Sequence, residues 1–175
     1  GLQATSVTTC AAALVTTGET YRLDNNISAD GTCLNVLANS IVIDCQGYAI
    51  NYSKVSDGSG ISNIGGYDNI IIQNCIIQQS VAGSTYTNGI TFFGVVNSTI
   101  KNNYIFPKGE LSNGIVLGSS EDNTILNNTI DTTNVLAIGT GSGILLNGTT
   151  PSRNNFIINN NFSVRTYSIL HLGGL

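Results

Sequence analysis

The feature that most constrains the fold of this 175-residue chain is an internal repeat. In four stretches an apolar residue is followed three positions later by Asn or Cys, and two positions after that by another apolar residue. The four copies are Ile72-Cys75-Ile77, Ile100-Asn103-Ile105, Ile125-Asn128-Ile130 and Ile157-Asn160-Phe162. A Gly-Ile pair precedes each copy, and these pairs begin at Gly60, Gly89, Gly114 and Gly143. Equivalent residues recur every 25 to 32 positions, which is a spacing typical of a solenoid.

Each copy consists of short strands separated by Asn, Gly and Ser. Alternation of apolar and polar residues is typical of half-buried strands, and Asn is favoured where the backbone turns in the left-handed region. We therefore predict an all-β parallel β-helix of about five to six coils, stacked about 4.8 Å apart with isoleucines in the interior. The alternative, an antiparallel sandwich, does not explain why both markers recur in the same order.

Three asparagines, Asn103, Asn128 and Asn160, fall at the same turn of successive coils. We expect them to stack and to pass amide hydrogen bonds from one coil to the next. Such a ladder satisfies buried polar groups that would otherwise destabilise the fold by about 1–3 kcal/mol each.

All four cysteines lie in the first 75 residues. Cys75 occupies the ladder position of its coil and Cys45 the matching turn one coil earlier, so stacking brings them within disulfide range. We predict a Cys45–Cys75 bond and, by elimination, a Cys10–Cys33 bond that ties an N-terminal strand and cap segment (1–33) to the coils (34–175) of a single domain. Buried reduced thiols are the alternative.

The ends, cysteines and sequons of the chain together indicate export. The chain begins at Gly1 rather than Met, so we expect a processed product from which a signal peptide has been removed. Paired cysteines favour a non-reducing compartment. Six N-x-[ST] sequons are candidate glycosylation sites, although a chain rich in Asn and Thr also forms sequons by chance. These sites are Asn26, Asn51, Asn97, Asn127, Asn147 and Asn161.

Charge and hydropathy exclude two classes of partner. Charged residues make up 9% of the chain and the formal net charge is −4, so there is no cluster of cations to bind nucleic acid. No apolar run reaches the 18 or so residues of a membrane-spanning helix.

The stretch from Tyr21 to Ile50, the segment beginning at Asn69 and the later Asn-Thr-Ile copies resemble right-handed parallel β-helix repeat proteins of the pectin-lyase-like superfamily. They are most similar to secreted or surface-anchored members from archaea and little-studied bacteria. The resemblance covers about residues 10 to 172. It implies a right-handed solenoid, an exported location and a role in adhesion or polysaccharide contact, whereas fold alone does not define an activity.

The acidic residues do not predict an enzyme. We expect Asp68 and Asp122 at equivalent repeat positions two coils apart, close to the separation of an inverting carboxylate pair, but an Asp at the start of a strand also serves to bond the backbone. Glu121 and Arg153 are expected to form a surface ion pair. The only histidine, His171, has no evident partner. We therefore expect no catalytic residue, no metal site and no cofactor, with a polysaccharide lyase or hydrolase as the less favoured reading.

Carbohydrate binding is the other alternative, because the chain contains several aromatic residues that could stack on sugars. The Phe92-Phe93 pair is the most suggestive, since one of two consecutive strand residues points outward. The candidates are Tyr48, Tyr52, Tyr67, Tyr86, Tyr104, Phe92, Phe93 and Phe106.

The two ends of the solenoid predict self-association. The last copy stops a few residues into a new coil with no polar cap after it, whereas the N-terminal segment is apolar and rich in Thr. We expect the N-terminal segment of one subunit to cover the last coil of the next, which builds filaments because a head-to-tail contact does not close. The expected assembly residues are Leu2, Val7, Ile169, Leu170 and Leu172. The alternative is that the chain is a fragment of a longer solenoid. The predicted function is thus that of an extracellular, non-enzymatic structural or adhesive protein whose partners are copies of itself and glycans.

Overall fold

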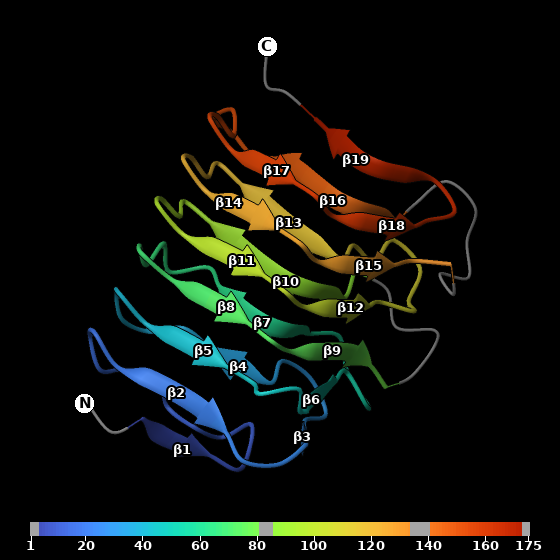
Figure 1. Cartoon of the computed structure of the whole chain (residues 1–175). Coiled ribbons are helices and arrows are strands. Elements are labelled where there is room, and N and C mark those ends of the chain that lie inside the picture. Colours follow the sequence, from blue (N-terminus) through green and yellow to red (C-terminus); the bar gives the residue numbers. More distant parts are fainter. Residues whose placement is uncertain (1–3, 81–85, 134–140, 173–175) are drawn as a thin grey trace.

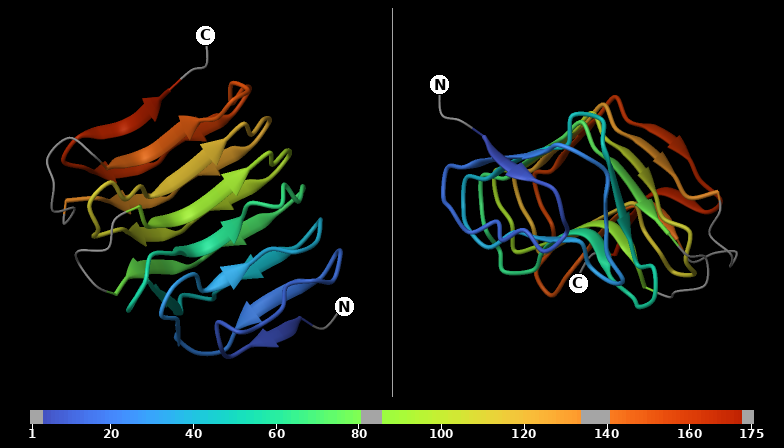
Figure 2. Two further views of the ribbon diagram at one scale, coloured as in Figure 1. Left: turned by 180° about the vertical axis from the view of Figure 1, so that it is seen from behind. Right: turned by 90° about the horizontal axis from the view of Figure 1, so that it is seen from below.

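A computed structural model describes residues 4–80, 86–133 and 141–172, and within these residues it contains strands and turns but no helix. The strands wind into a parallel β-solenoid of about five turns, with the two ends of the chain at opposite ends of the stack (Figure 1). Seen along its axis, the solenoid has three flat sides joined by turns (Figure 2). The prediction of an all-β parallel solenoid is confirmed.

Three parallel sheets form the sides, and from β2 onward each coil contributes one short strand to each sheet, whereas β1 adds a strand to the first sheet alone. The first sheet contains β1 (Thr5–Val7), β2 (Thr20–Leu23), β5 (Val42–Asp44), β8 (Ile71–Gln73), β11 (Thr99–Lys101), β14 (Thr124–Leu126) and β17 (Phe156–Ile158). The second sheet contains β3 (Ile27–Ser28), β6 (Ala49–Tyr52), β9 (Ile76–Gln79), β12 (Tyr104–Phe106), β15 (Thr129–Asp131) and β18 (Asn161–Ser163). The third sheet contains β4 (Leu34–Asn35), β7 (Ser59–Asn63), β10 (Asn88–Phe93), β13 (Ile115–Gly118), β16 (Ser142–Asn147) and β19 (Tyr167–His171).

The repeated isoleucines form one continuous column inside each sheet. In the first sheet Ile72, Ile100 and Ile125 are direct partners in neighbouring strands, and all three are buried. The columns of the other two sheets have the same register. They contain Ile50, Ile77, Ile105 and Ile130 in the second sheet, and Ile61, Ile90, Ile115 and Ile144 in the third. The core is therefore a spine of stacked β-branched side chains, which pack well on a pleated surface.

The glycine of each Gly-Ile marker lies where the third sheet comes close to the second. A Cβ atom added to Gly114 would lie 2.4 Å from the Cγ2 of Ile130 and 2.6 Å from the carbonyl oxygen of Gly143. Gly60, Gly89 and Gly143 face equivalent obstacles, and in each case one of them is a backbone oxygen of the next coil. The marker recurs because any side chain at this position would push stacked coils apart.

Replacement of Gly114 by alanine is expected to lower the free energy of unfolding by about 3 kcal/mol, because neither the backbone oxygen nor the buried isoleucine can move aside without unstacking a coil. Urea unfolding measures the change. Gly94→Ala is the matched control: Gly94 has a φ of +64° and no atom near its Cβ position, so only backbone strain of about 1 kcal/mol is expected. Equal losses in the two variants would contradict this explanation of the marker.

The predicted asparagine ladder is present at the turn between the first and second sheets. The Oδ1 of Asn128 accepts hydrogen bonds from the backbone N–H and the side-chain amide of Asn103, both at 3.0 Å. The Oδ1 of Asn160 accepts the same pair from Asn128, and the ladder ends at Cys75, whose N–H donates to Asn103. Each side-chain amide also donates to a backbone carbonyl of the preceding coil, such as Asn128 to Ile100 at 2.9 Å.

A second ladder, which was not predicted, lies at the turn between the third and first sheets. Asn155 accepts from the backbone and side chain of Asn123, and Asn123 accepts from the N–H of Ser98. The residue in front of each ladder asparagine is Asn or Asp and adopts a left-handed backbone, with φ of 56° at Asn102, 54° at Asn127 and 55° at Asp122. The Asn-Asn pairs thus have two distinct roles: the first residue turns the chain, and the second bonds the coils.

Both predicted disulfides, Cys10–Cys33 and Cys45–Cys75, are present, with Cα–Cα distances of 4.6 and 4.7 Å. The first joins the N-terminal segment to the turn before β4, and the second joins neighbouring coils at the base of the ladder. The coils begin earlier than the predicted boundary at residue 34, because β1, β2 and β3 already belong to the first and second sheets.

The two ends of the stack differ in how well their interior residues are covered. At the N-terminal end Val7, Leu14 and Ile27 are at most 3% exposed. At the other end Ile169 extends the column of Ile144 but is 44% exposed, whereas Ile144 is fully buried. Ile157 and Phe162, at the ends of the other two columns, are only partly buried. Among the described residues nothing covers the last coil.

Candidate functional site

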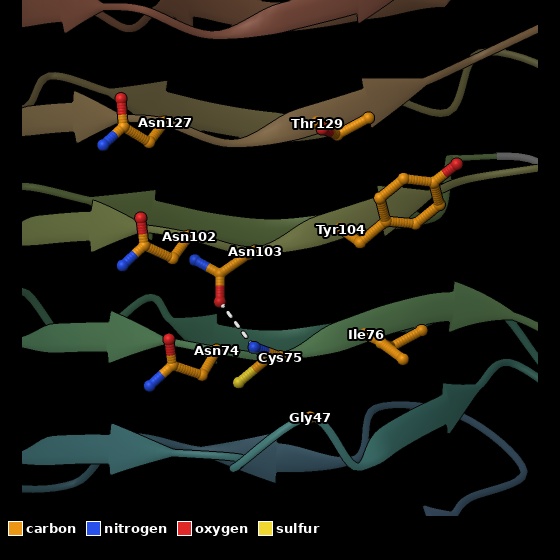
Figure 3. Close-up of a pocket in the computed structure, with 9 residues that line it drawn as sticks. All are labelled: Gly47, Asn74, Cys75, Ile76, Asn102, Asn103, Tyr104, Asn127 and Thr129. Carbon is orange, nitrogen blue, oxygen red and sulfur yellow. Dashed lines mark hydrogen bonds between the residues drawn. The ribbon is translucent and has the colours of Figure 1, made fainter.

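A shallow groove of about 400 Å³ crosses four coils at the turn between the first and second sheets, on the side of the solenoid (Figure 3). Stacked coils place equivalent residues of the repeat in columns, so that both walls of the groove are columns. The lining residues are Gly47, Asn74, Cys75, Ile76, Asn102, Asn103, Tyr104, Asn127 and Thr129.

One wall is formed by Asn74, Asn102 and Asn127, whose side chains project outward in the same direction (Figure 3). Their backbones have φ values between 54° and 57°, which explains why this residue type recurs. The amides of Asn102 and Asn127 make no hydrogen bond to any described residue, and both residues are exposed. Asn74 donates its amide N–H to Asp44 at 3.0 Å. The wall thus presents a row of amide donors and acceptors to solvent.

The opposite wall comes from the first residues of three strands of the second sheet. Tyr104 pairs in register with Ile76 on one side and with Thr129 on the other, and all three side chains project outward (Figure 3). Tyr104 is 41% exposed, and its ring centroid lies 3.9 Å from that of Phe106, two residues along the same strand. Phe106 therefore supports the ring that faces the groove.

No charged side chain lines the groove. The nearest carboxylate in the hydrogen-bond network is that of Asp44, which is bonded to Asn74, to Gln73 and to the N–H of Gln46. Partial desolvation raises the pKa of Asp44, but the hydrogen bonds from Asn74, Gln73 and Gln46 outweigh it, so the pKa lies below its ordinary value. Asp44 is therefore an ionised anchor for Asn74 at neutral pH.

Tyr104 and Phe106 are the predicted sugar-stacking candidates at this groove. Tyr52 and Phe92 are fully buried, so they are not surface aromatics, and burial raises the pKa of Tyr52. Phe93 is the outward member of its pair, as predicted; it is 39% exposed and lies over Gly118 on the third sheet. Tyr48, Tyr67 and Tyr86 are not part of the groove lining either. The surface aromatics are thus distributed over different faces.

The structure corrects the register assumed for the carboxylates. Ile71, Thr99 and Thr124 are partners in the first sheet, so Asn69, Asn97 and Asp122, two residues before them, are equivalent. Asp68 therefore lies one position earlier in its coil than Asp122 does. The Oδ1 of Asp68 accepts the N–H of Val96 at 2.8 Å. The predicted ion pair between Arg153 and Glu121 is present at 3.4 Å. Asp68 thus bonds the backbone of the next coil, as Asp at a turn commonly does.

Two further features concern metals and membranes. In the described ranges no group of three or more His, Cys, Asp or Glu side chains is placed to hold a metal ion. His171 is exposed at the end of β19. The part of the chain that the structure describes has no helix long and apolar enough to span a membrane.

Four of the six sequon asparagines are exposed, namely Asn26, Asn97, Asn127 and Asn161, whereas Asn51 and Asn147 are half-buried. Asn26 and Asn51 also use their side-chain oxygens to accept intramolecular hydrogen bonds. Exposure makes the first group the sterically more accessible acceptors, and whether any site carries a glycan stays a prediction.

The predicted assembly residues differ in how exposed their side chains are. Leu172 is 54% exposed and Ile169 44%, while Leu170 is half-buried. Val7 is 1% exposed and packs in the core, so its side chain is not available to another subunit. Leu2 lies outside the described residues.

Comparison of the chain with protein-family models, with curated proteins and with solved structures found no match. The structure thus establishes the class, a disulfide-bonded parallel β-solenoid, and no relative adds an activity to it.

The groove was not predicted from the sequence, although the signal for one wall was present. Asn102 and Asn127 stand directly before the ladder residues Asn103 and Asn128, and Asn74 stands before Cys75. A column of turn asparagines follows from this spacing. Tyr104 follows Asn102 by two residues, so the same spacing also places it beside this column.

Proposed function

We propose that this protein is an extracellular, non-enzymatic structural or adhesive surface protein that assembles end to end into a filament or layer. The single observation that carries the proposal is the difference between the two ends of the solenoid: interior residues are buried at the N-terminal end, but half-buried at β17 and β18 and exposed at β19. An open parallel sheet offers unpaired backbone groups together with apolar side chains, which is a template for further strands.

The geometry favours a second copy of the chain as the occupant. In the first sheet β1 and β17 are the two edges, and a head-to-tail contact would continue the parallel sheet from β17 of one subunit to β1 of the next. Exposed residues of the segment after β1 are small and uncharged, for example Thr8, Ala11 and Ala13, which favours their packing against the last coil.

The compartment supports the same proposal. Two disulfides indicate folding in a non-reducing environment, and extracellular location is the simplest such environment for a chain with exposed sequons. The resemblance to secreted and surface-anchored members of the pectin-lyase-like superfamily agrees with it. We include membership of that superfamily, the right-handed coil and glycosylation in the proposal.

The proposal is tested by comparing the chain with a variant at its open end. We expect the unmodified protein to form particles larger than one chain in light scattering, and fibres or sheets in electron microscopy. Ile169→Lys places a charge on the open coil and should leave only single chains. Val55→Lys is the control, because Val55 is a 77%-exposed apolar residue in a lateral loop, and it should assemble normally.

Two outcomes contradict the proposal. One is a strictly single-chain particle at high concentration of the unmodified protein. The other is normal assembly of Ile169→Lys, provided that its unfolding curve shows an intact fold.

A further inference from the structure

We propose that the groove between the Asn74-Asn102-Asn127 column and Tyr104 binds a neutral oligosaccharide that lies along the solenoid axis. The site goes beyond the end-to-end assembly proposed above and does not depend on it, because the groove lies on the side of the coils rather than at either end (Figure 3).

The first argument is the chemistry of the walls. An amide offers two donors and an acceptor, which match the hydroxyl groups of a sugar in either direction. The amides of Asn102 and Asn127 have no partner among the described residues, so a ligand would not have to displace an existing protein hydrogen bond. Tyr104, half-exposed and two residues along the chain from Asn102, provides an apolar surface for the C–H face of a sugar ring and a hydroxyl at its rim.

The second argument is periodicity. Successive coils repeat the same amide about every 4.8 Å, so the wall is a regular row rather than an isolated contact. Gly47 leaves one end of the groove open, and Thr129 adds a hydroxyl at the other end (Figure 3). A row of equivalent donors and acceptors matches a polymer that carries hydroxyl groups at regular intervals.

The third argument is charge. The lining contains no cation to pair with a carboxylate or sulfate, and the nearby Asp44 is ionised. Acidic polysaccharides such as polygalacturonate would therefore bring like charge toward Asp44, with no cation in the groove lining to bind their carboxylates. This selects neutral sugars over uronic acids.

The fourth argument is that the groove is rigid. Asn103 and Cys75 form its floor, and both are held by the ladder and by a disulfide. Asn74 is fixed by Asp44, and the ring of Tyr104 is supported by Phe106. A preorganised site loses little side-chain freedom when it binds a flexible oligosaccharide.

The test uses the full chain, made in an oxidising compartment that attaches no N-glycans, because a glycan on Asn127 would begin at the rim of the groove. The protein is applied to an array of neutral oligosaccharides of glucose, mannose, galactose and N-acetylglucosamine, with oligogalacturonate as the acidic probe. The strongest neutral probe is then titrated by calorimetry. We expect dissociation constants in the micromolar to millimolar range, as for other shallow and solvated sites.

Four variants locate the site. Tyr104→Ala should weaken binding at least 10-fold, whereas Tyr104→Phe, which keeps the ring, should weaken it less than threefold. Asn102→Gly removes the amide and tolerates the left-handed backbone, so it should weaken binding about three- to tenfold without harm to the fold. Phe93→Ala removes an exposed aromatic ring from another face and should leave binding unchanged.

An independent readout follows from the composition, because the chain has seven tyrosines and no tryptophan. With isotope-labelled tyrosine rings, the bound sugar should shift the resonance that disappears in Tyr104→Phe and leave that of the buried Tyr52 unchanged. The proposal is overturned if no neutral probe binds at millimolar concentration, if oligogalacturonate binds better than every neutral probe, or if both Tyr104→Ala and Asn102→Gly bind normally.

Discussion

Replacing Asn128 by alanine is expected to lower the free energy of unfolding by about 4 kcal/mol. The side chain accepts two hydrogen bonds from Asn103 and donates one to the carbonyl of Ile100, and both asparagines are at most 3% exposed. The variant removes the partners of the N–H of Asn103 and of the Ile100 carbonyl in the ladder, and one of the two hydrogen bonds of the Asn103 amide, which still donates to Ile72. A buried polar group without a partner destabilises a fold by about 1–3 kcal/mol. Urea unfolding followed by circular dichroism measures the change.

The matched control is the preceding residue. Asn127→Gly removes an exposed amide with no partner among the described residues and keeps a left-handed backbone, so its effect should stay within about 0.5 kcal/mol. A loss below about 1 kcal/mol in Asn128→Ala, or equal losses in the two variants, would show that the ladder does not hold the coils together.

The double variant Cys45→Ala/Cys75→Ala should lose about 3.5 kcal/mol of stability. The bond closes a loop with a sequence separation of 30 residues, and loop-closure entropy gives a stabilisation of this size. Because Cys45 and Cys75 lie at the base of the ladder, between β5–β6 and β8–β9, we expect the whole unfolding transition to shift to lower urea concentration.

The second disulfide provides the comparison. Cys10→Ala/Cys33→Ala removes the bond that holds the segment before β2, so local fraying should precede global unfolding. Hydrogen exchange should then accelerate at β1 and around Leu14 while the amides of β8 and β11 keep their protection. Faster exchange throughout the chain would mean that the N-terminal segment and the coils form one cooperative unit.

The repeat made much of the fold predictable. The spacing of the isoleucines gives both the strand register and the parallel direction, since Ile72, Ile100 and Ile125 can stack in one column only if each coil runs the same way. The Cys45–Cys75 bond and the ladder at Asn103 follow from the same register. Each of these features depends on one residue that recurs at a fixed distance from a turn.

Features that depend on turn length could not be predicted in this way. The repeat varies between 25 and 32 residues, and the variation lies in the turns around the third sheet, because the first and second sheets are five residues apart in every copy, as from Ile100 to Ile105. Asp68 lies four residues before Ile72, whereas Asp122 lies three before Ile125, so the two were wrongly taken as equivalent. Val7 was expected to be an assembly residue, but it is buried because β1 already belongs to the first sheet. The groove beside Tyr104 depends on the size and direction of side chains, which the repeat spacing does not give.

The most direct test of the central claim is a set of methyl–methyl nuclear Overhauser contacts, measured on protein labelled at the isoleucine δ1-methyl groups. The account predicts three separate chains of contacts, for example from Ile72 through Ile100 to Ile125, between residues far apart in sequence. If the isoleucines instead contact only sequence neighbours, or if the contacts require strands of opposite direction, the coils do not stack as described.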